Sequence, residues 1–226
     1  MSAIRRVWIT RAEPGARRTA DRLSALGFSP VVTPLLAIRP LPQPSPDLTG
    51  IAALAVTSRN GVAAFAALSA ARDLPVFAVG DATAAAARAA GFADVRSAAG
   101  ALDDLARLLA AEAPADGVVL APGAREPAGD LPALLVGRVS VRPLAVYEAV
   151  ETGAAAPAAF DAVLVHSPRA GRALAALGPF AGQVAIPISP AAAAPLEGGS
   201  GLDIRLAARP DEAAMFEALG KPAPRV

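Results

Sequence analysis

Short runs of apolar residues alternate along the chain with longer stretches rich in Ala, Leu and Arg. The runs have the length of buried strands, and small, polar or proline residues follow each of them. They lie at residues 6–9, 51–56, 76–79, 117–120, 162–165 and 184–188. The stretches between them are typical of helices and the connections are short, so the pattern predicts parallel sheets with helices on both faces. We therefore expect an α/β protein.

Glycines mark the predicted ends of three helices. Gly27, Gly91 and Gly178 each follow a stretch that contains several Ala residues. Glycine is the usual residue just beyond a helix C-terminus, because it adopts positive φ without steric cost. Each of these glycines is therefore predicted to end a helix.

The chain also repeats itself with an offset of 109 residues. Residues 56–61 (VTSRNG) correspond to residues 165–170 (VHSPRA), and a helical stretch follows both. The same offset relates further pairs of segments, namely 32–35 with 141–144, 79–80 with 188–189, and 94–95 with 203–204. One offset shared by separate segments indicates two similar α/β lobes.

Two extended, proline-containing segments predict how the lobes divide the chain. Residues 33–40 and 141–148 have the pattern of two crossovers between lobes rather than of one linker. Lobe one is then discontinuous, with residues 1–35 and 149–226, and lobe two contains residues 36–148. Ligands often bind at domain junctions and at the C-terminal ends of parallel strands, so we expect a ligand in a cleft between the lobes.

The composition narrows the class of partner. Hydrophobic residues make up 54% of the chain and aromatic residues only 4%, which suits small side chains packed between helices and sheets. The formal net charge is +1, from 21 basic and 20 acidic residues. Nucleic-acid binders carry a basic patch or stripe, so this balance disfavours a nucleic-acid partner. Nearly all basic residues are Arg, which suits an anionic small molecule, although GC-rich codon usage explains the same bias.

The residue inventory excludes several kinds of chemistry. The absence of Cys excludes disulfides and thiol catalysis, and the single His, His166, is too few for a His-based metal site. The apolar run after Arg5 and Arg6 is too short for a signal peptide, and the Ala-rich stretches are interrupted before they reach membrane-spanning length. We expect a soluble, cytoplasmic protein that does not contact a membrane.

Five short segments together resemble one enzyme family. They are Thr10-Arg11 after the first strand, residues 56–61, residues 78–84 (AVGDATA), Val146-Tyr147, and residues 167–170 (SPRA). Each segment alone is a weak signal, but their order and spacing over nearly the whole chain are similar to those of uroporphyrinogen-III synthase. The resemblance implies two α/β lobes joined by a two-stranded ladder, which agrees with the predicted crossovers.

The resemblance also implies a reaction. The substrate is hydroxymethylbilane, a linear tetrapyrrole with eight carboxylates, which loses its hydroxyl as water and becomes an electrophilic azafulvene. Attack by ring D at its substituted carbon gives a spiro intermediate, which reopens and closes with ring D inverted; unassisted closure gives the type I isomer. Such a reactive substrate needs positioning and one acid. The resemblance implies no cofactor and no metal, a monomer, and transient contact with hydroxymethylbilane synthase.

Tyr147 is the predicted catalytic residue. It is the only Tyr in the chain and falls at the Tyr of the family's second crossover. Its phenol would donate a proton or hydrogen bond to the departing hydroxyl; the alternative is an amphipathic side chain that covers the ladder. Ser58 and Ser167 follow repeat-related strands. They either cap the next helix or, with free backbone N–H groups, surround substrate carboxylates.

The other predicted substrate contacts lie at strand ends and in loops. Gly80 and Thr83 match a family loop in which Gly80 lets the backbone approach a ligand, and the alternative is a turn into a helix. Arginines after strands either pair with carboxylates or are solvated, and these are Arg11, Arg59, Arg125 and Arg169. The predicted substrate-binding set is Thr10, Arg11, Ser58, Arg59, Gly80, Thr83, Ser167, Arg169 and Ser189.

Two positions depart from the family pattern. Ala192 stands where a later loop of the family has Thr, so only backbone groups and Ser189 of that loop are available to a ligand. His166 stands where Thr is common, and a lone His at a strand end is more often packed than catalytic. The altered loop leaves open a non-catalytic, two-lobed sensor or binding protein for an anionic small molecule. A response-regulator-like protein is disfavoured, because no acidic cluster follows the first strand to hold Mg²⁺.

Overall fold

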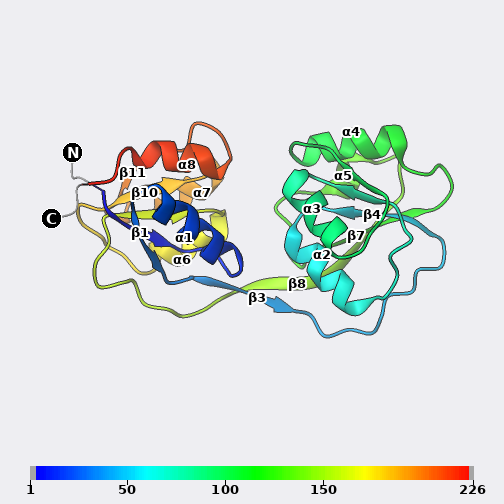
Figure 1. The fold of residues 1–226 in the computed structure, drawn as a ribbon, viewed down its shortest axis with the longest axis horizontal. Helices are drawn as coiled ribbons and strands as arrows, with labels where there is room; N and C mark the ends of the chain where they lie inside the picture. Colours follow the sequence, from blue (N-terminus) through cyan, green and yellow to red (C-terminus); the bar gives the residue numbers. More distant parts are fainter. Residues whose placement is uncertain (1–3, 224–226) are drawn as a thin grey trace. The chain divides into compact units, whose positions relative to one another are not determined.

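The structure, a computed structural model, describes residues 4–223, and the chain forms two compact units (Figure 1). Lobe one contains Met1–Ala37 and Val150–Val226, and lobe two contains Ile38–Ala149. Each lobe is a mainly parallel sheet covered by helices, which confirms the predicted fold class. Within residues 4–223, no helix combines the length and the apolar character that a membrane span requires.

Lobe one is built on a five-stranded sheet. Its strand order is β11 (Asp203–Ile204), β10 (Val184–Pro187), β9 (Ala162–Val165), β1 (Arg6–Ile9) and β2 (Ser29–Val32), and all these neighbours are parallel. The central strands are fully buried, as the continuous apolar runs predicted. Val7 and Ile9 pack with α1 (Gly15–Ala25) and α8 (Glu212–Leu219). Trp8, which points to the other face, packs with α6 (Pro168–Ala175) and α7 (Pro190–Ala193).

Lobe two repeats this plan around a six-stranded sheet. Its order is β3 (Leu36–Pro40), β8 (Val141–Glu151), β7 (Val118–Ala124), β4 (Ile51–Val56), β5 (Val76–Ala78) and β6 (Val95–Ser97). Leu54 and Val56 pack with α2 (Arg59–Leu68) and α3 (Asp81–Ala89). Ala53 and Ala55 pack on the opposite face with α4 (Leu102–Glu112) and α5 (Leu131–Leu134). The alternation buries both faces of β4.

The two predicted crossovers are strands β3 and β8, which are neighbours in the sheet (Figure 1). Both strands begin in one unit and end in the other. Their pairing continues past the ends of β3, where the Leu41 N–H donates to the Val146 carbonyl and the Thr152 N–H donates to the Leu35 carbonyl, each at 3.0 Å. The chain therefore passes twice through a hydrogen-bonded two-stranded ladder.

The ends of the helices show whether the three predicted glycines lie just beyond a helix C-terminus. Gly27 and Gly91 have φ of +89° and +97° and directly follow the last residues of α1 and α3 and their caps, so both predictions are confirmed. The prediction for Gly178 is wrong. Helix α6 ends at Ala175 with Ala176 as a right-handed cap, and a Cβ at Gly178 would lie 3.4 Å from the carbonyl oxygens of Ala175 and Ser200. A Cβ at Gly178 would therefore make ordinary contacts, and Gly178 lies in the segment that follows the helix and its cap.

Candidate active site

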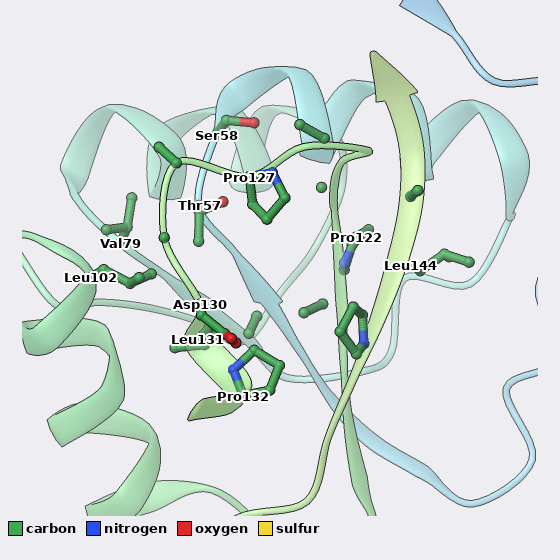
Figure 2. A pocket seen from close by; sticks show the side chains of 18 of the residues that line it. Thr57, Ser58, Val79, Leu102, Pro122, Pro127, Asp130, Leu131, Pro132 and Leu144 are labelled. Carbon is green, nitrogen blue, oxygen red and sulfur yellow. The ribbon is translucent and has the colours of Figure 1, made fainter. Parts of the chain in front are cut away.

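Lobe two contains a cavity of about 810 Å³ at the C-terminal ends of its central strands. Its wall is formed by the ends of β4 and β7, by the middle of β8 and by residues 125–132 (Figure 2). Figure 2 shows Val79 and Leu102 on one side and Pro122 and Leu144 on the other. The C-terminal edge of a parallel sheet is the usual place for a ligand site, because the loops that leave it diverge there.

Two hydroxyl groups meet in the wall of this cavity. The phenol oxygen of Tyr147, on β8, lies 3.0 Å from Oγ of Ser58, which follows β4. Tyr147 is buried, with 9% of its surface exposed. The structure therefore brings together the predicted catalytic residue and one predicted substrate-binding residue, although they are 89 positions apart in the sequence.

The position of Ser58 follows from its role as the N-cap of α2. Its backbone is extended (φ −154°, ψ 153°), and its Oγ accepts a hydrogen bond of 3.0 Å from the Gly61 N–H. Gly61 also permits close packing, because a Cβ there would lie 2.6 Å from the backbone oxygen of Pro122 on β7. The first turn of α2 is therefore held against the cavity wall, and the Ser58 hydroxyl is held with it.

Arg125 extends the site with a positive charge. It follows β7 directly, lines the cavity, and donates its backbone N–H to the Tyr147 carbonyl at 2.8 Å. Its Nη1 lies 2.7 Å from Oε2 of Glu148, and Nε of Arg39 lies 2.8 Å from Oε1 of the same carboxylate. Two guanidinium groups thus share one carboxylate, and both remain largely exposed. This cluster carries a net positive charge that a substrate carboxylate can meet.

The predicted Gly80 loop lies beside the cavity and does not line it. Val79 is a lining residue, while Gly80 is the N-cap of α3 and its carbonyl accepts the Thr83 N–H at 3.0 Å. The Thr83 side chain is 6% exposed and belongs to the buried part of α3. Arg59, the other predicted residue of lobe two, is the half-buried first residue of α2.

A polar cluster of lobe one surrounds Glu212, the first residue of α8, and includes the predicted residue Arg11. Arg11 follows β1, and its Nη1 lies 3.1 Å from Oε1 of Glu212. Thr19 and Arg22 of α1 also hydrogen-bond to this carboxylate. Thr10 is fully buried, and its hydroxyl donates to the Leu164 carbonyl at 2.7 Å, which ties β1 to β9. The Thr10 hydroxyl and the Arg11 guanidinium therefore each bind another group of lobe one.

His166 is part of the same cluster. Its Nε2 lies 3.4 Å from Oε1 of Glu212, and neither ring nitrogen has a hydrogen-bond partner among the described residues. Burial lowers the pKa of His166, which outweighs the attraction of the nearby carboxylate. Burial opposes the ionisation of Glu212, but the close approach of His166 and Thr19 and the charge of Arg11 outweigh it and lower its pKa to about 2. Glu212 is therefore a carboxylate that compensates Arg11, beside a neutral His166.

Ser167 and Ser189 each cap a helix of lobe one. The Ser167 Oγ accepts the Ala170 N–H at 3.2 Å, and the Ser189 Oγ accepts the Ala192 N–H at 3.3 Å. Ala192 is fully buried, so this position contributes packing to the core. Arg169 lies in the first turn of α6, as the second residue of the helix. The side chains of Ser58, Ser167 and Ser189 thus each cap a helix.

The sequence patterns missed much of the cavity wall. Thr57 and the segment 127–132 line it, together with Leu102 from α4. Asp130, in that segment, caps α5 by accepting the Ala133 N–H at 3.1 Å. Thr57 belongs to the motif at residues 56–61, whereas Leu102 and residues 127–132 carry no motif. Only the proline- and glycine-containing composition of residues 122–132 signals an irregular loop. Among the described residues, no group of three or more His, Asp or Glu side chains is arranged to hold a metal ion.

Comparisons with known proteins agree with this architecture. The chain matches the family model described as uroporphyrinogen-III synthase HemD over residues 17–217. It is similar to the crystal structure of uroporphyrinogen-III synthetase from Helicobacter pylori, with 20% identity, a TM-score of 0.66, and 95% of this chain and 97% of that chain covered. A mutant uroporphyrinogen III synthase from Thermus thermophilus gives 18% identity, a TM-score of 0.56 and coverage of 94% and 96%. No curated protein sequence matches the chain.

The structural likeness, at 20% identity or less, shows the fold. The family model shows more than the fold, because its match over residues 17–217 spans most of the chain and includes Ser58, Tyr147 and Ser167. The chain therefore belongs to the uroporphyrinogen-III synthase family of cyclising lyases.

Proposed function

We propose that this uroporphyrinogen-III synthase cyclises hydroxymethylbilane at the lobe-two cavity, with Tyr147 as the acid. The observation that carries the proposal is the contact of 3.0 Å between the phenol of the sole Tyr and Ser58, in the wall of a cavity of about 810 Å³. A pocket of this volume is large enough for part of a tetrapyrrole. The acid would thus lie beside the bound end of the substrate.

The lining supports binding of pyrrole rings inside the cavity and of carboxylates at Arg125. Most lining residues are apolar or small, and Asp130 is the acidic member of the lining. An acidic group disfavours substrate carboxylates and accepts hydrogen bonds from pyrrole N–H groups. Arg125, whose side chain is 57% exposed, pairs with Glu148 through Nη1, and an exposed guanidinium can also meet a substrate carboxylate. We assign the rings to the cavity wall and one carboxylate to Arg125.

In this proposal Tyr147 acts when the substrate loses its hydroxyl. The phenol donates its proton to the hydroxyl oxygen, the C–O bond breaks with its electron pair remaining on oxygen, and water leaves. The resulting azafulvene is attacked by the substituted carbon of ring D, and the spiro intermediate rearranges to the type III product. The final loss of a proton from the new ring restores the phenol. Positioning of ring D decides the isomer, because unassisted closure gives type I.

The remaining predicted residues are proposed as contacts of the substrate periphery. In lobe one these residues are Arg11, which pairs with Glu212, and Ser167, Arg169 and Ser189 at the starts of α6 and α7. The backbone N–H groups at the start of α6 favour anions. In lobe two, Arg59, Gly80 and Thr83 belong to the starts of α2 and α3. Thr10 would act through Arg11, because its own hydroxyl is bonded to Leu164.

We also propose a monomeric, cytoplasmic enzyme that receives hydroxymethylbilane from hydroxymethylbilane synthase by transient contact. The instability of the linear substrate supports such a transfer. A gel-filtration mass and a competition assay with an excess of inactive synthase test these two points. A slower reaction in the presence of the inactive synthase is the expected result.

Filling the cavity tests the proposed site. Ala145, an exposed residue of β8, lines the cavity, and Ala110, an exposed residue of α4, does not. Ala145→Phe should lower kcat/KM for the type III product by about tenfold or more and reduce the rise in Tm caused by uroporphyrinogen III. Ala110→Phe should stay within about twofold of wild type. Equal effects of the two substitutions would show that the substrate does not enter this cavity.

A further inference from the structure

We propose that Ser58 is a positioning residue for Tyr147. Its hydroxyl donates a hydrogen bond to the phenol oxygen, orients the phenolic proton toward the substrate, and stabilises the phenolate that remains after proton transfer. This inference rests on the proposed role of Tyr147 as the acid. It assigns Ser58 a role other than direct substrate contact.

The hydrogen-bonding capacity of Ser58 leaves its hydroxyl proton available to Tyr147. A serine hydroxyl has one donor and two acceptor sites. One acceptor site of Ser58 is occupied by the Gly61 N–H at 3.0 Å, and the phenol oxygen of Tyr147 lies at 3.0 Å from the same Oγ. The hydroxyl proton of Ser58 is therefore free to point at Tyr147, while the Gly61 N–H increases the polarity of the hydroxyl.

The direction of this hydrogen bond decides what Tyr147 can do. A phenol that donates to Ser58 cannot donate the same proton to the substrate. When Ser58 donates instead, the phenolic proton is available to the leaving hydroxyl. After that proton has moved, the phenolate needs a donor, and the donor already in place is the Ser58 hydroxyl, 3.0 Å away. A hydrogen bond to a charged acceptor is about twice as strong as one between neutral groups, so Ser58 favours the transition state over the ground state.

The fold keeps this donor in a fixed position. Ser58 is anchored at the start of α2 by its cap, and Gly61 keeps the first turn of the helix close to the Pro122 carbonyl of β7. Tyr147 is 9% exposed and lies on β8, which pairs with β7 at Ala124. Both hydroxyls are thus carried by elements packed on the same strand. A preorganised donor of this kind costs little reorganisation during the reaction.

The test uses two substitutions at one position. Gly and Thr are similar N-cap residues, so Ser58→Gly and Ser58→Thr change the cap to a similar extent, but only Thr keeps a hydroxyl. We expect Ser58→Gly to lower kcat for the type III product by about 10-fold to 100-fold with KM within about twofold. Ser58→Thr should retain most of the wild-type kcat. Equal kcat values for the two variants would overturn the inference.

A spectroscopic readout checks the contact without relying on turnover. Because Tyr147 is the only tyrosine, incorporation of ring-¹³C tyrosine gives one Cζ signal in the NMR spectrum. Its chemical shift reports the hydrogen bond at the phenol oxygen. The signal should move in Ser58→Gly and stay near its wild-type position in Ser58→Thr. An unchanged signal in folded Ser58→Gly would contradict the contact.

The same variants in a Tyr147→Phe background separate the two proposals. If Ser58 acts through Tyr147, Ser58→Gly should cause little further loss of kcat once the phenol is absent. A full additional loss would overturn the positioning role while leaving Tyr147 as the acid. Wild-type kcat in Tyr147→Phe alone would overturn the acid and, with it, this inference.

Discussion

The loops at Ser58 and Ser167 have the same backbone and different surroundings. Both serines are extended N-caps after repeat-related strands, with φ/ψ of −154°/153° and −163°/158°, and both accept the N–H three residues later. In lobe two the Ser58 hydroxyl meets Tyr147 beside a cavity. In lobe one the residue before Ser167 is His166, which is buried against Glu212.

The difference shows how a repeated fold can carry chemistry in only one of its copies. In both lobes the local sequence determines the strand, the capping serine and the helix that follows. The side chains that surround this loop belong to strands or helices that are distant in the sequence. The residue 109 positions before Tyr147 is Ile38, on β3, so the repeat does not provide a second phenol. In lobe one, Glu212 instead compensates Arg11 and Arg22. We expect loss of activity from changes at Ser58 and Tyr147 and loss of stability from changes around Glu212.

The largest contrast should come from Tyr147→Phe and His166→Gln. Removal of the phenol should lower kcat for type III formation by about 100-fold, the lower end of what a general acid contributes. His166→Gln should leave kcat within about twofold of wild type, because the His166 ring contacts Glu212 and is closed off from solvent. Stopped assays of both folded variants check this. A comparable loss of kcat in His166→Gln would contradict the assignment of catalysis to lobe two alone.

The next largest effect concerns stability and uses two glutamates of the same helix. Glu212 is 17% exposed and contacts Arg11 and Arg22, whereas Glu217 is 62% exposed and pairs with Arg209. Glu212→Gln should lower the free energy of unfolding by about 2–3 kcal/mol, because it leaves guanidinium groups uncompensated in a partly buried site. Glu217→Gln should cost about 0–1 kcal/mol. Urea unfolding at neutral pH measures both, and similar values would contradict the assigned roles.

The same cluster predicts how stability depends on pH. Burial lowers the pKa of His166 below 6.5, so below that pH the unfolded chain binds a proton that the folded chain does not. The free energy of unfolding should therefore decrease as the pH falls below 6.5. Glu212, with its pKa lowered from 4.5 to about 2, should add a further loss as the pH falls through that interval. His166→Gln should abolish the first loss and reduce the second, because His166 contributes to the low pKa of Glu212. Unfolding measured at each pH checks both.

The smallest expected effect is that of a chelator. If hydroxyl groups and positioning perform the reaction, EDTA should leave the rate of type III formation unchanged. The absence of Cys and the single His make a tightly held metal unexpected. Inhibition by EDTA that added metal reverses would contradict a reaction carried by side chains alone.

Most of the fold could be predicted because its signals are local. The buried parallel strands are continuous apolar runs, and the structure places β1, β4 and β9 at the predicted residues. Strand β7 extends to Ala124, beyond the predicted end at residue 120, because its pairing with β8 continues past the apolar run. Gly178 was mispredicted because the sequence shows a glycine after a helical stretch but not the earlier end of α6.

Much less of the site could be predicted, since its contacts join distant segments. Tyr147 and Ser58 were each identified from motifs, but their contact depends on β8 and the end of β4 lying on either side of β7. The pairing of Glu212 with Arg11 and His166 depends on where α8 packs, which no short pattern records. Residues 127–132 become part of the cavity only when lobe two folds.

An analysis of the product isomers tests directly whether this protein forms the type III product through Tyr147. Hydroxymethylbilane is generated in situ by its synthase, this protein is added, and the oxidised type I and type III uroporphyrins are separated by chromatography. The account predicts predominantly type III with the wild-type protein and a return toward type I with Tyr147→Phe, as unassisted closure overtakes the slowed enzyme. Predominant type I with folded wild-type protein would contradict the account.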